Sequence, residues 1–290
     1  MLREIAGPHG SILLGFDFPI GLPMRYAEKV GLTNFRTALP LFGEGEWASF
    51  YQPARSPDQI SLHRPFYPAK PGGARQKFLI EGLGVENIQD LRRVCEFAHP
   101  GRRAAAPLFW TMGAQQVGKA AISGWRDVIG PAMRDPHEEL FLWPFDGALD
   151  ELLEGGSLVI AETYPGEIYQ ALKLHFPSPT ELKLGFGEPT PIRKSGKRSQ
   201  AGRRWNAVAL MNWSKSARVQ LDPQLEALIQ DGFGPGPKGE DPFDTTVGLF
   251  GMINVLSGFQ PEWTPSLQSS GAEAIREVEG WILGQVEGPL

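Results

Sequence analysis

The sequence of 290 residues contains one cysteine, Cys95, and no long apolar run. A single cysteine excludes an internal disulfide and a cysteine-rich zinc site, so we expect a reducing compartment and a buried, apolar role for Cys95. No apolar run approaches the roughly 18 residues that a membrane span needs. The first ten residues also lack the basic start and apolar middle of a secretory signal. The expected location is the cytoplasm, without a membrane partner.

Several catalytic motifs are missing as well. The five histidines show neither HExxH nor another spacing typical of zinc, and no GxSxG elbow of a serine hydrolase is present. The segment from Gly113 to Lys119 nearly matches the phosphate-binding loop GxxxxGK[ST], but Ala120 replaces the hydroxyl that should hold magnesium. A small-molecule or nucleotide enzyme that uses this loop is therefore an alternative with little sequence support.

Net charge limits the possible partners. With 28 basic and 33 acidic residues the formal net charge is −5, which argues against a protein that coats nucleic acid by bulk charge. One acid-free basic segment could still hold a nucleic-acid backbone; it contains Arg193, Lys194, Lys197, Arg198, Arg203 and Arg204. A solvated face of a basic helix is the competing explanation.

Two apolar runs that end in an acid predict buried parallel strands. Residues 11–16 (SILLGF) precede Asp17, and residues 157–164 (SLVIAETY) contain Glu162 near their end, each followed by Pro and Gly. Strands buried on both faces usually lie in a parallel sheet. Residues 140–145 (LFLWPF) are a candidate edge strand, and residues 278–284 (VEGWILG) are strand-like. An α/β fold is the expected class.

The remaining elements are expected to be helices and loops. Residues 31–85 lack sustained periodicity and are rich in Gly, Pro and aromatic residues, which predicts loops and short helices. Asp222 before Pro223 is typical of a helix start, and Gly248 and Gly251 suggest a helix that approaches a sheet closely. Helices are predicted over 88–95, 167–174, 200–213 and 223–230, and a later helix is predicted with Asp244 in its first turn.

Three carboxylates could form a site. Parallel strands place their carboxyl ends on one rim of the sheet, where open α/β sheets bind ligands, so Asp17 and Glu162 are expected neighbours. Asp244, in the first turn of a later helix, could supply a third acid. Clustered carboxylates repel one another unless protons or cations neutralise them, and Mg²⁺ or Mn²⁺ does so with oxygen ligands. Such ions can activate water and stabilise the leaving oxygen of a phosphodiester.

Each of these acids also has a structural explanation. Asp17 could initiate the turn before Phe18-Pro19, and Glu162 could form a salt bridge. Asp244 could stabilise the N-terminal end of a helix dipole, in a helix that begins at Pro242 with Asp241 as its N-cap. Further acids that could reach the rim are Glu279 and Asp146.

Four ordered blocks across nearly the whole chain carry a family resemblance. They are GFDFPIGLP (15–23), AETYPGEIY (161–169), DPFDTTVGLFGMI (241–253) and EVEGWILG (277–284), and together they resemble the bacterial and archaeal family known as domain of unknown function 429. That family is regarded as predicted nucleases with a ribonuclease H-like fold. The resemblance, which extends to the Holliday-junction resolvase-like branch, implies a mixed sheet flanked by helices in a single domain over 1–290, with a loop-rich insertion at about 31–135.

The resemblance also implies a function. It assigns Asp17 or its immediate neighbours, Glu162 and Asp244 as catalytic metal ligands of an Mg²⁺- or Mn²⁺-dependent nuclease, a hydrolase that cleaves DNA or RNA. The basic residues Lys194, Lys197, Arg198 and Arg203 would hold the nucleic acid.

One feature departs from the family. Its members open with a strand bearing the first catalytic aspartate and a strand hairpin, and neither precedes residues 11–16 here. A truncated chain, a misassigned start or a lost metal ligand would each explain this. The alternative function is therefore a non-catalytic nucleic-acid-binding module of the same fold, or an inactive truncated homologue.

Overall fold

The computed structural model describes residues 2–7, 9–100, 102–113, 116–136, 139–176, 196–262 and 270–285. The chain divides into two compact units: unit 1 is Met1–Thr163 with Glu262–Leu290, and unit 2 is Tyr164–Pro261. One domain over residues 1–290 stays a prediction. In the described ranges, no helix has the length and apolar character that crossing a bilayer requires.

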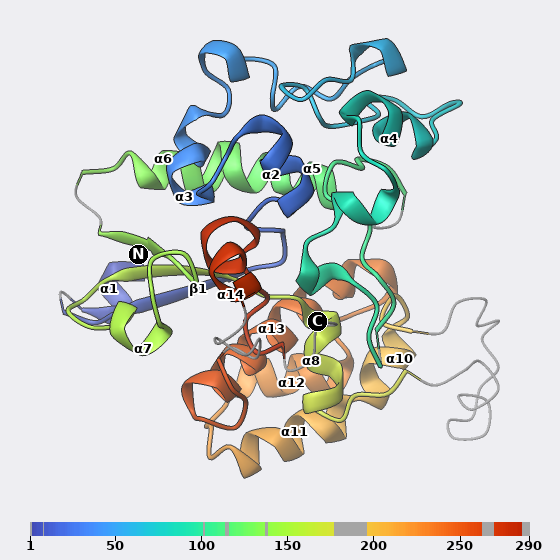
Figure 1. The fold of residues 1–290 in the computed structure, drawn as a ribbon. Coiled ribbons are helices and arrows are strands. Elements are labelled where there is room, and N and C mark those ends of the chain that lie inside the picture. Colours follow the sequence, from blue (N-terminus) through green and yellow to red (C-terminus); the bar gives the residue numbers. More distant parts are fainter. Residues whose placement is uncertain are drawn as a thin grey trace. The chain divides into compact units, whose positions relative to one another are not determined.

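Unit 1 contains a small parallel sheet, which confirms the α/β class (Figure 1). Its described strands are β1 (Ile12–Phe16), β2 (Leu140–Leu142) and β3 (Leu158–Glu162), in the order β1-β3-β2. Ile12 lies opposite Leu158 and Phe16 opposite Glu162, so both strands end at the same rim. The central strand β3 is buried as predicted, but the prediction that β1 is fully buried is wrong: at the edge of this sheet its residues are half-buried.

Helices and turns surround this sheet in unit 1. As predicted, residues 31–85 form loops and short helices. The prediction of a helix over 88–95 is wrong. Arg92 and Arg93 have extended backbone and separate two 3-10 turns, η4 (Ile88–Leu91) and η5 (Val94–Glu96). The α-helices of unit 1 are α1 (Leu2–Ala6), α2 (Met24–Val30), α3 (Phe35–Ala38), α4 (Lys77–Leu83), α5 (Val117–Ser123), α6 (Gly130–Met133), α7 (Leu149–Leu152) and α14 (Ser270–Ala274).

The segment predicted as a loop-rich insertion supplies much of the core of unit 1. Phe42 stacks on Phe50 with ring centroids 3.9 Å apart, and both rings lie 6.3 Å from the ring of Trp125. Leu142 and Ile160 of the sheet belong to the same buried cluster. Because burial of large aromatic side chains dominates core energetics, this segment is integral to the fold of unit 1.

Two glycines bring distant segments of unit 1 together. A Cβ on Gly21, whose φ is +136°, would lie 2.0 Å from the carbonyl oxygen of Glu279. A Cβ on Gly280, whose φ is +65°, would lie 2.2 Å from the carbonyl oxygen of Ile20. Only glycine permits this approach, so the turn after β1 lies directly against residues 279–280.

The strand predicted over 278–284 is largely wrong. Residues Ile275–Glu279 form a π-helical turn, η8, and only Ile282 pairs with the sheet, through an isolated parallel bridge to Glu162. Gly280 accounts for the difference, because its positive φ at the end of η8 redirects the chain before strand pairing can extend.

In the residues that the structure describes, unit 2 is built of helices around an apolar core. They are α8 (Pro165–Ala171), α10 (Gln200–Trp205), α11 (Ala207–Ser216), α12 (Pro223–Asp231) and α13 (Glu240–Leu256). The short helix predicted over 167–174 corresponds to α8, and the helix predicted over 200–213 is divided at Asn206 into α10 and α11. The start of α12 is confirmed, because the Asp222 side chain accepts a hydrogen bond from the Gln224 N–H at 2.7 Å.

Two details of α13 differ from the prediction. The helix begins at Glu240 after Gly239, so Asp241 lies in its first turn and is not the N-cap. Gly251 packs against a helix, not a sheet: a Cβ there would lie 2.7 Å from the Ile168 side chain of α8. Close packing at Gly251 is therefore confirmed, but the predicted packing partner, a sheet, is wrong.

Replacement of Gly21 by alanine should destabilise unit 1 severely, because the new Cβ would overlap the backbone of Glu279. Gly31→Ala is the matched control, since Gly31 also has positive φ (+68°) but open space around it. The control should cost about 1–2 kcal/mol and Gly21→Ala clearly more, measured by urea unfolding. Equal losses for the two variants would contradict this packing.

Candidate functional site

Glu162, the last residue of β3, is buried at the rim of the sheet with 4% of its surface exposed. Its two carboxylate oxygens each accept a hydrogen bond from the Arg93 guanidinium at 2.7 Å. One of them also accepts from the Ile20 N–H, likewise at 2.7 Å. This bidentate geometry is the strongest kind of charge-assisted pair, so the carboxylate predicted to hold a metal already has a cation.

Arg93 is completely buried and its polar hydrogens are fully used. Besides Glu162, its guanidinium contacts the carboxylate of Glu96 at 3.0 Å and 3.1 Å. It also donates to the carbonyl oxygens of Ile20 and Glu279, both at 3.1 Å. A guanidinium has five N–H donors, and these acceptors satisfy them all. Arg93 thus joins β3, the turn after β1, η5 and η8.

Glu279 is the third carboxylate of this group, which we call the Arg93 cluster (Arg93, Glu96, Glu162 and Glu279). Its oxygens accept hydrogen bonds from the backbone N–H groups of Met24, at 3.0 Å, and Val94, at 2.8 Å. With all groups ionised, three carboxylates and one guanidinium give the cluster a formal charge of −2. Burial of this excess charge is unfavourable, and one bound proton would halve it.

Two acids of the cluster, Glu162 and Glu279, have pKa values above those of free carboxyls. Burial raises the pKa of Glu279, although the N–H groups of Val94 and Met24 and the charge of Arg93 oppose the shift. Burial also raises the pKa of Glu162, against the charge and hydrogen bonds of Arg93. The geometry is that of an ionised Glu162, so Glu279 is the better candidate for taking up a proton.

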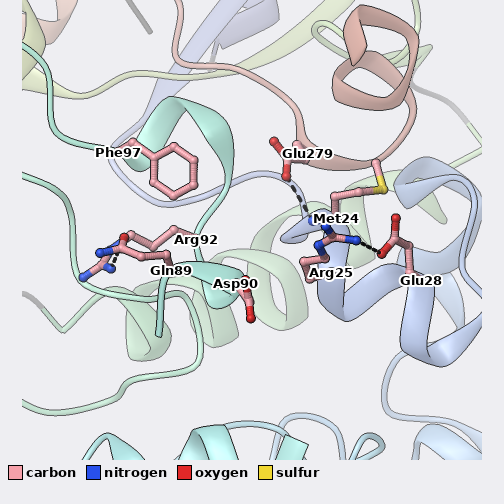
Figure 2. Close-up of a pocket in the computed structure, with 8 residues that line it drawn as sticks. All are labelled: Met24, Arg25, Glu28, Gln89, Asp90, Arg92, Phe97 and Glu279. Carbon is pink, nitrogen blue, oxygen red and sulfur yellow. Dashed lines mark hydrogen bonds and ion pairs between the residues drawn. The ribbon is translucent and has the colours of Figure 1, made fainter. Parts of the chain in front are cut away.

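Glu279 also lines a cavity of about 380 Å³ in unit 1. Figure 2 shows Phe97, Gln89 and Arg92 on one side of it and Met24, Arg25 and Glu28 on the other. Arg92 donates to the Gln89 side chain at 2.6 Å, and Arg25 pairs with Glu28 at 3.1 Å. A buried acid beside a cavity of this size, with a raised pKa, can exchange a proton or a hydrogen bond with a small polar molecule.

Asp244 lies in unit 2, on α13, and has its own cation. Its carboxylate accepts from the Lys197 ammonium at 2.5 Å and from the Tyr169 hydroxyl at 3.1 Å. Lys197 also lies 3.4 Å from Glu240, one turn earlier on the helix. Burial raises the pKa of Asp244, and the hydrogen bond from Lys197 opposes that shift.

The other predicted acids have different surroundings. Asp17 follows β1 directly and is exposed. Asp146 accepts a hydrogen bond from the Leu142 N–H at 2.6 Å and pairs with Arg36 at 3.1 Å, so it closes the turn after β2. Across the described ranges, no three histidine, cysteine, aspartate or glutamate side chains form a group that could hold a metal ion.

The predicted nucleic-acid contacts divide into structural and exposed residues. Arg203 is 1% exposed and donates to the carbonyls of Lys197, Gly232, Gly234 and Gly236, which fixes the loop before α13. Lys197 pairs with Asp244, and Arg198, more than half exposed, pairs with Glu240 at 3.3 Å. Lys194 lies outside the described residues.

The near-match to a phosphate-binding loop has a packing explanation at one position. A Cβ on Gly118 would lie 2.8 Å from the Leu108 carbonyl oxygen and 2.9 Å from that of Trp110. Gly118 belongs to α5 and lets this helix touch the preceding backbone. Residues 114–115 of the motif lie outside the described residues.

Comparisons with known proteins leave the family undecided. No family model matches the chain, and neither a curated protein nor a solved structure does. Membership of the family known as domain of unknown function 429 therefore stays a prediction from the four sequence blocks.

Sequence reasoning missed the central residue, Arg93, and gave Glu279 only a minor place. The available signal was the charged pair Arg92-Arg93 between the apolar residues Leu91 and Val94. A charge that interrupts a buried segment needs a partner, and the unexplained acid at the end of β3 needed one as well. Cys95 is buried, as predicted.

The stability of unit 1 should depend on Glu279 in a defined pH range. An acid whose pKa is raised by folding stabilises the folded state below its unfolded pKa, and this contribution is lost as pH rises through the folded pKa. Because folding raises the pKa of Glu279, the free energy of unfolding of the wild type should fall as pH rises above the ordinary pKa of a glutamate, by at most about 1.4 kcal/mol per pH unit for one proton.

Glu279→Gln should remove this part of the pH dependence, since glutamine cannot titrate. Urea unfolding followed by tryptophan fluorescence at several pH values measures the difference between the variant and the wild type. Glu28→Gln, an exposed substitution at the same cavity, is the control. Parallel pH profiles for the wild type and Glu279→Gln would show that Glu279 has no raised pKa.

Proposed function

We propose that this chain binds nucleic acid without cleaving it, on a ribonuclease H-like fold that has replaced catalytic metal by cationic side chains. The observation that carries the proposal is the pairing of two predicted metal ligands with cations of the chain itself. Glu162 is bound by Arg93 and Asp244 by Lys197. Carboxylates that already pair with a cationic side chain gain less from binding Mg²⁺ or Mn²⁺.

The parallel sheet supports the proposed fold. β1 and β3 pair directly, and Asp17, the residue after β1, lies at the same rim as Glu162, the last residue of β3. The resemblance likewise implies acids at the ends of two strands. Gly21, Glu162, Glu279 and Gly280, which belong to three of the four sequence blocks, all serve the close packing around Arg93. The fold therefore requires residues of these sequence blocks even in a chain that has no catalytic activity.

A basic, acid-free segment of unit 2 supports nucleic-acid binding. Residues 196–221 contain six basic residues and no acidic residue. Arg204 of α10 is exposed, and Val208, Asn212 and Lys215 are exposed at helical spacing on one face of α11. Trp205 beside Arg204 is 36% exposed. Basic groups along a face with an accessible aromatic ring suit the backbone and bases of a single strand.

Metal-dependent hydrolysis stays a prediction. A cleavage assay with an Asp17 variant distinguishes it from binding without cleavage. Asp17 is exposed and outside the Arg93 cluster, so Asp17→Asn should leave the fold intact. If the chain cleaves single-stranded DNA or RNA in Mn²⁺ and Asp17→Asn abolishes cleavage, the hydrolytic function is correct and the binding-only proposal is wrong.

Binding itself is tested by fluorescence anisotropy with labelled single-stranded DNA and RNA. Affinity should fall as salt rises, should be unchanged by EDTA, and should drop about tenfold or more in Arg204→Glu/Lys215→Glu. Arg25→Glu/Lys77→Glu, with the same change in net charge on exposed residues of unit 1, should bind like the wild type. If both double variants lose the same affinity for nucleic acid, then the net charge of the chain causes binding and this face does not.

A further inference from the structure

The turn that follows α13 in unit 2 presents an aromatic ring to solvent. Phe259 is 59% exposed, the largest exposed fraction of any aromatic side chain that the structure describes. A large apolar side chain in this position gains nothing from burial in the core of its own unit. Its conformation is nevertheless fixed by the backbone around it.

The capping of α13 holds Phe259 in place. The Gly258 N–H donates to the Val255 carbonyl at 3.0 Å, and the Phe259 N–H donates to the Asn254 carbonyl at 2.8 Å. With Gly258 at a φ of +72°, these two bonds form a Schellman motif, in which the side chain after the glycine usually packs back on the helix. The position on which it would pack is Asn254, a polar residue, and the ring stays exposed on a fixed backbone.

Asn254 also connects this turn to α11, the helix that carries most of the residues proposed to bind nucleic acid. Its side-chain oxygen accepts from the Trp213 indole at 2.7 Å, and its amide donates to the Gln260 side chain at 3.1 Å. Trp213 stacks on Phe250 of α13, with ring centroids 3.9 Å apart. The turn after α13 is therefore attached to the last turn of α11, which contains Lys215.

The segment around Phe259 is uncharged. Residues 245–261 contain neither an acidic nor a basic residue. The next acid along the chain, Glu262, accepts hydrogen bonds from the Trp143 indole and the Leu149 N–H, so its charge is engaged. No carboxylate of residues 245–261 would therefore repel a phosphate that adjoins the ring.

We propose that Phe259 stacks on an unpaired base of a strand bound along α10 and α11, so that this chain selects single strands over duplexes. The inference rests on the nucleic-acid binding proposed above. An exposed aromatic ring can stack on any base, because every base has a π-face. In a duplex those faces are already stacked on neighbouring bases and are not accessible to Phe259.

The selection is tested by fluorescence anisotropy with a labelled single strand of about 15 nucleotides and with the duplex of the same sequence. At the same salt concentration, the wild type should bind the single strand at least about fivefold more tightly than the duplex. Equal affinities for the two would overturn the inference and leave the proposed function standing. No binding of either would overturn both.

Substitutions at position 259 test the ring itself. Phe259→Ala and Phe259→Leu should unfold like the wild type because the position is exposed, and each should bind the single strand about fivefold or more weakly. Phe259→Trp should retain the affinity, since it keeps an aromatic face. Leu228→Ala, which truncates an exposed apolar residue of α12, is the control and should bind like the wild type. Wild-type affinity in Phe259→Ala and Phe259→Leu, with Arg204→Glu/Lys215→Glu still weakened, would refute stacking alone.

A strand without bases separates stacking from other effects of the substitution. The loss of affinity in Phe259→Ala should disappear with an abasic sugar-phosphate strand of the same length, since no base is left to stack. A loss of the same size with the abasic strand would contradict the inference. If Phe259→Ala converts a dimer to a monomer in sedimentation and leaves the affinity unchanged, then the ring serves self-association and the inference is wrong.

Discussion

The bidentate ion pair between Arg93 and Glu162 is the interaction on which unit 1 depends. It joins the last residue of the central strand to a segment that was predicted as part of a loop-rich insertion. Through Glu96, Ile20 and Glu279 the same guanidinium also fixes the turn after β1 and the π-helical turn η8. Removal of Arg93 would leave buried, uncompensated carboxylates, which is far more costly than the loss of a surface pair.

The same constraint shapes the functional interpretation. Carboxylates gathered near a sheet rim require a counter-charge, and either a divalent ion or a cationic side chain can supply it. In unit 1 the counter-charge is Arg93, and in unit 2 Lys197 serves Asp244 and Glu240. An acid-rich sequence block therefore does not by itself indicate catalysis, because the residues that neutralise it can lie far away in the chain.

Local patterns predicted the elements whose causes are local. The apolar runs at 11–16 and 157–164 gave β1 and β3, and Asp222-Pro223 gave the start of α12. The two 3-10 turns around Arg93 were missed because Ile88, Leu91, Val94 and Cys95 have helical spacing, while tertiary contacts of Arg93 hold the backbone extended. Local apolar spacing carries no information about such contacts.

The candidate site was predictable only as a set of acids. Glu162 was identified correctly as an acid in need of a partner, but the identity of that partner depends on contacts across 69 residues of sequence. The role of Arg203 was likewise hidden, because a basic run looks the same whether its side chains face solvent or bind backbone carbonyls.

A double-mutant cycle on Arg93 and Glu162 tests the central claim most directly. Arg93→Met alone should lower the free energy of unfolding by about 3–5 kcal/mol. Arg93→Met/Glu162→Leu should recover part of that loss, because Glu96 and Glu279 still lack their cation. A coupling energy of several kcal/mol would establish that Arg93 is the counter-charge of Glu162. If the losses in free energy of unfolding of the two single variants add up to that of the double variant, Arg93 is not the counter-charge of Glu162.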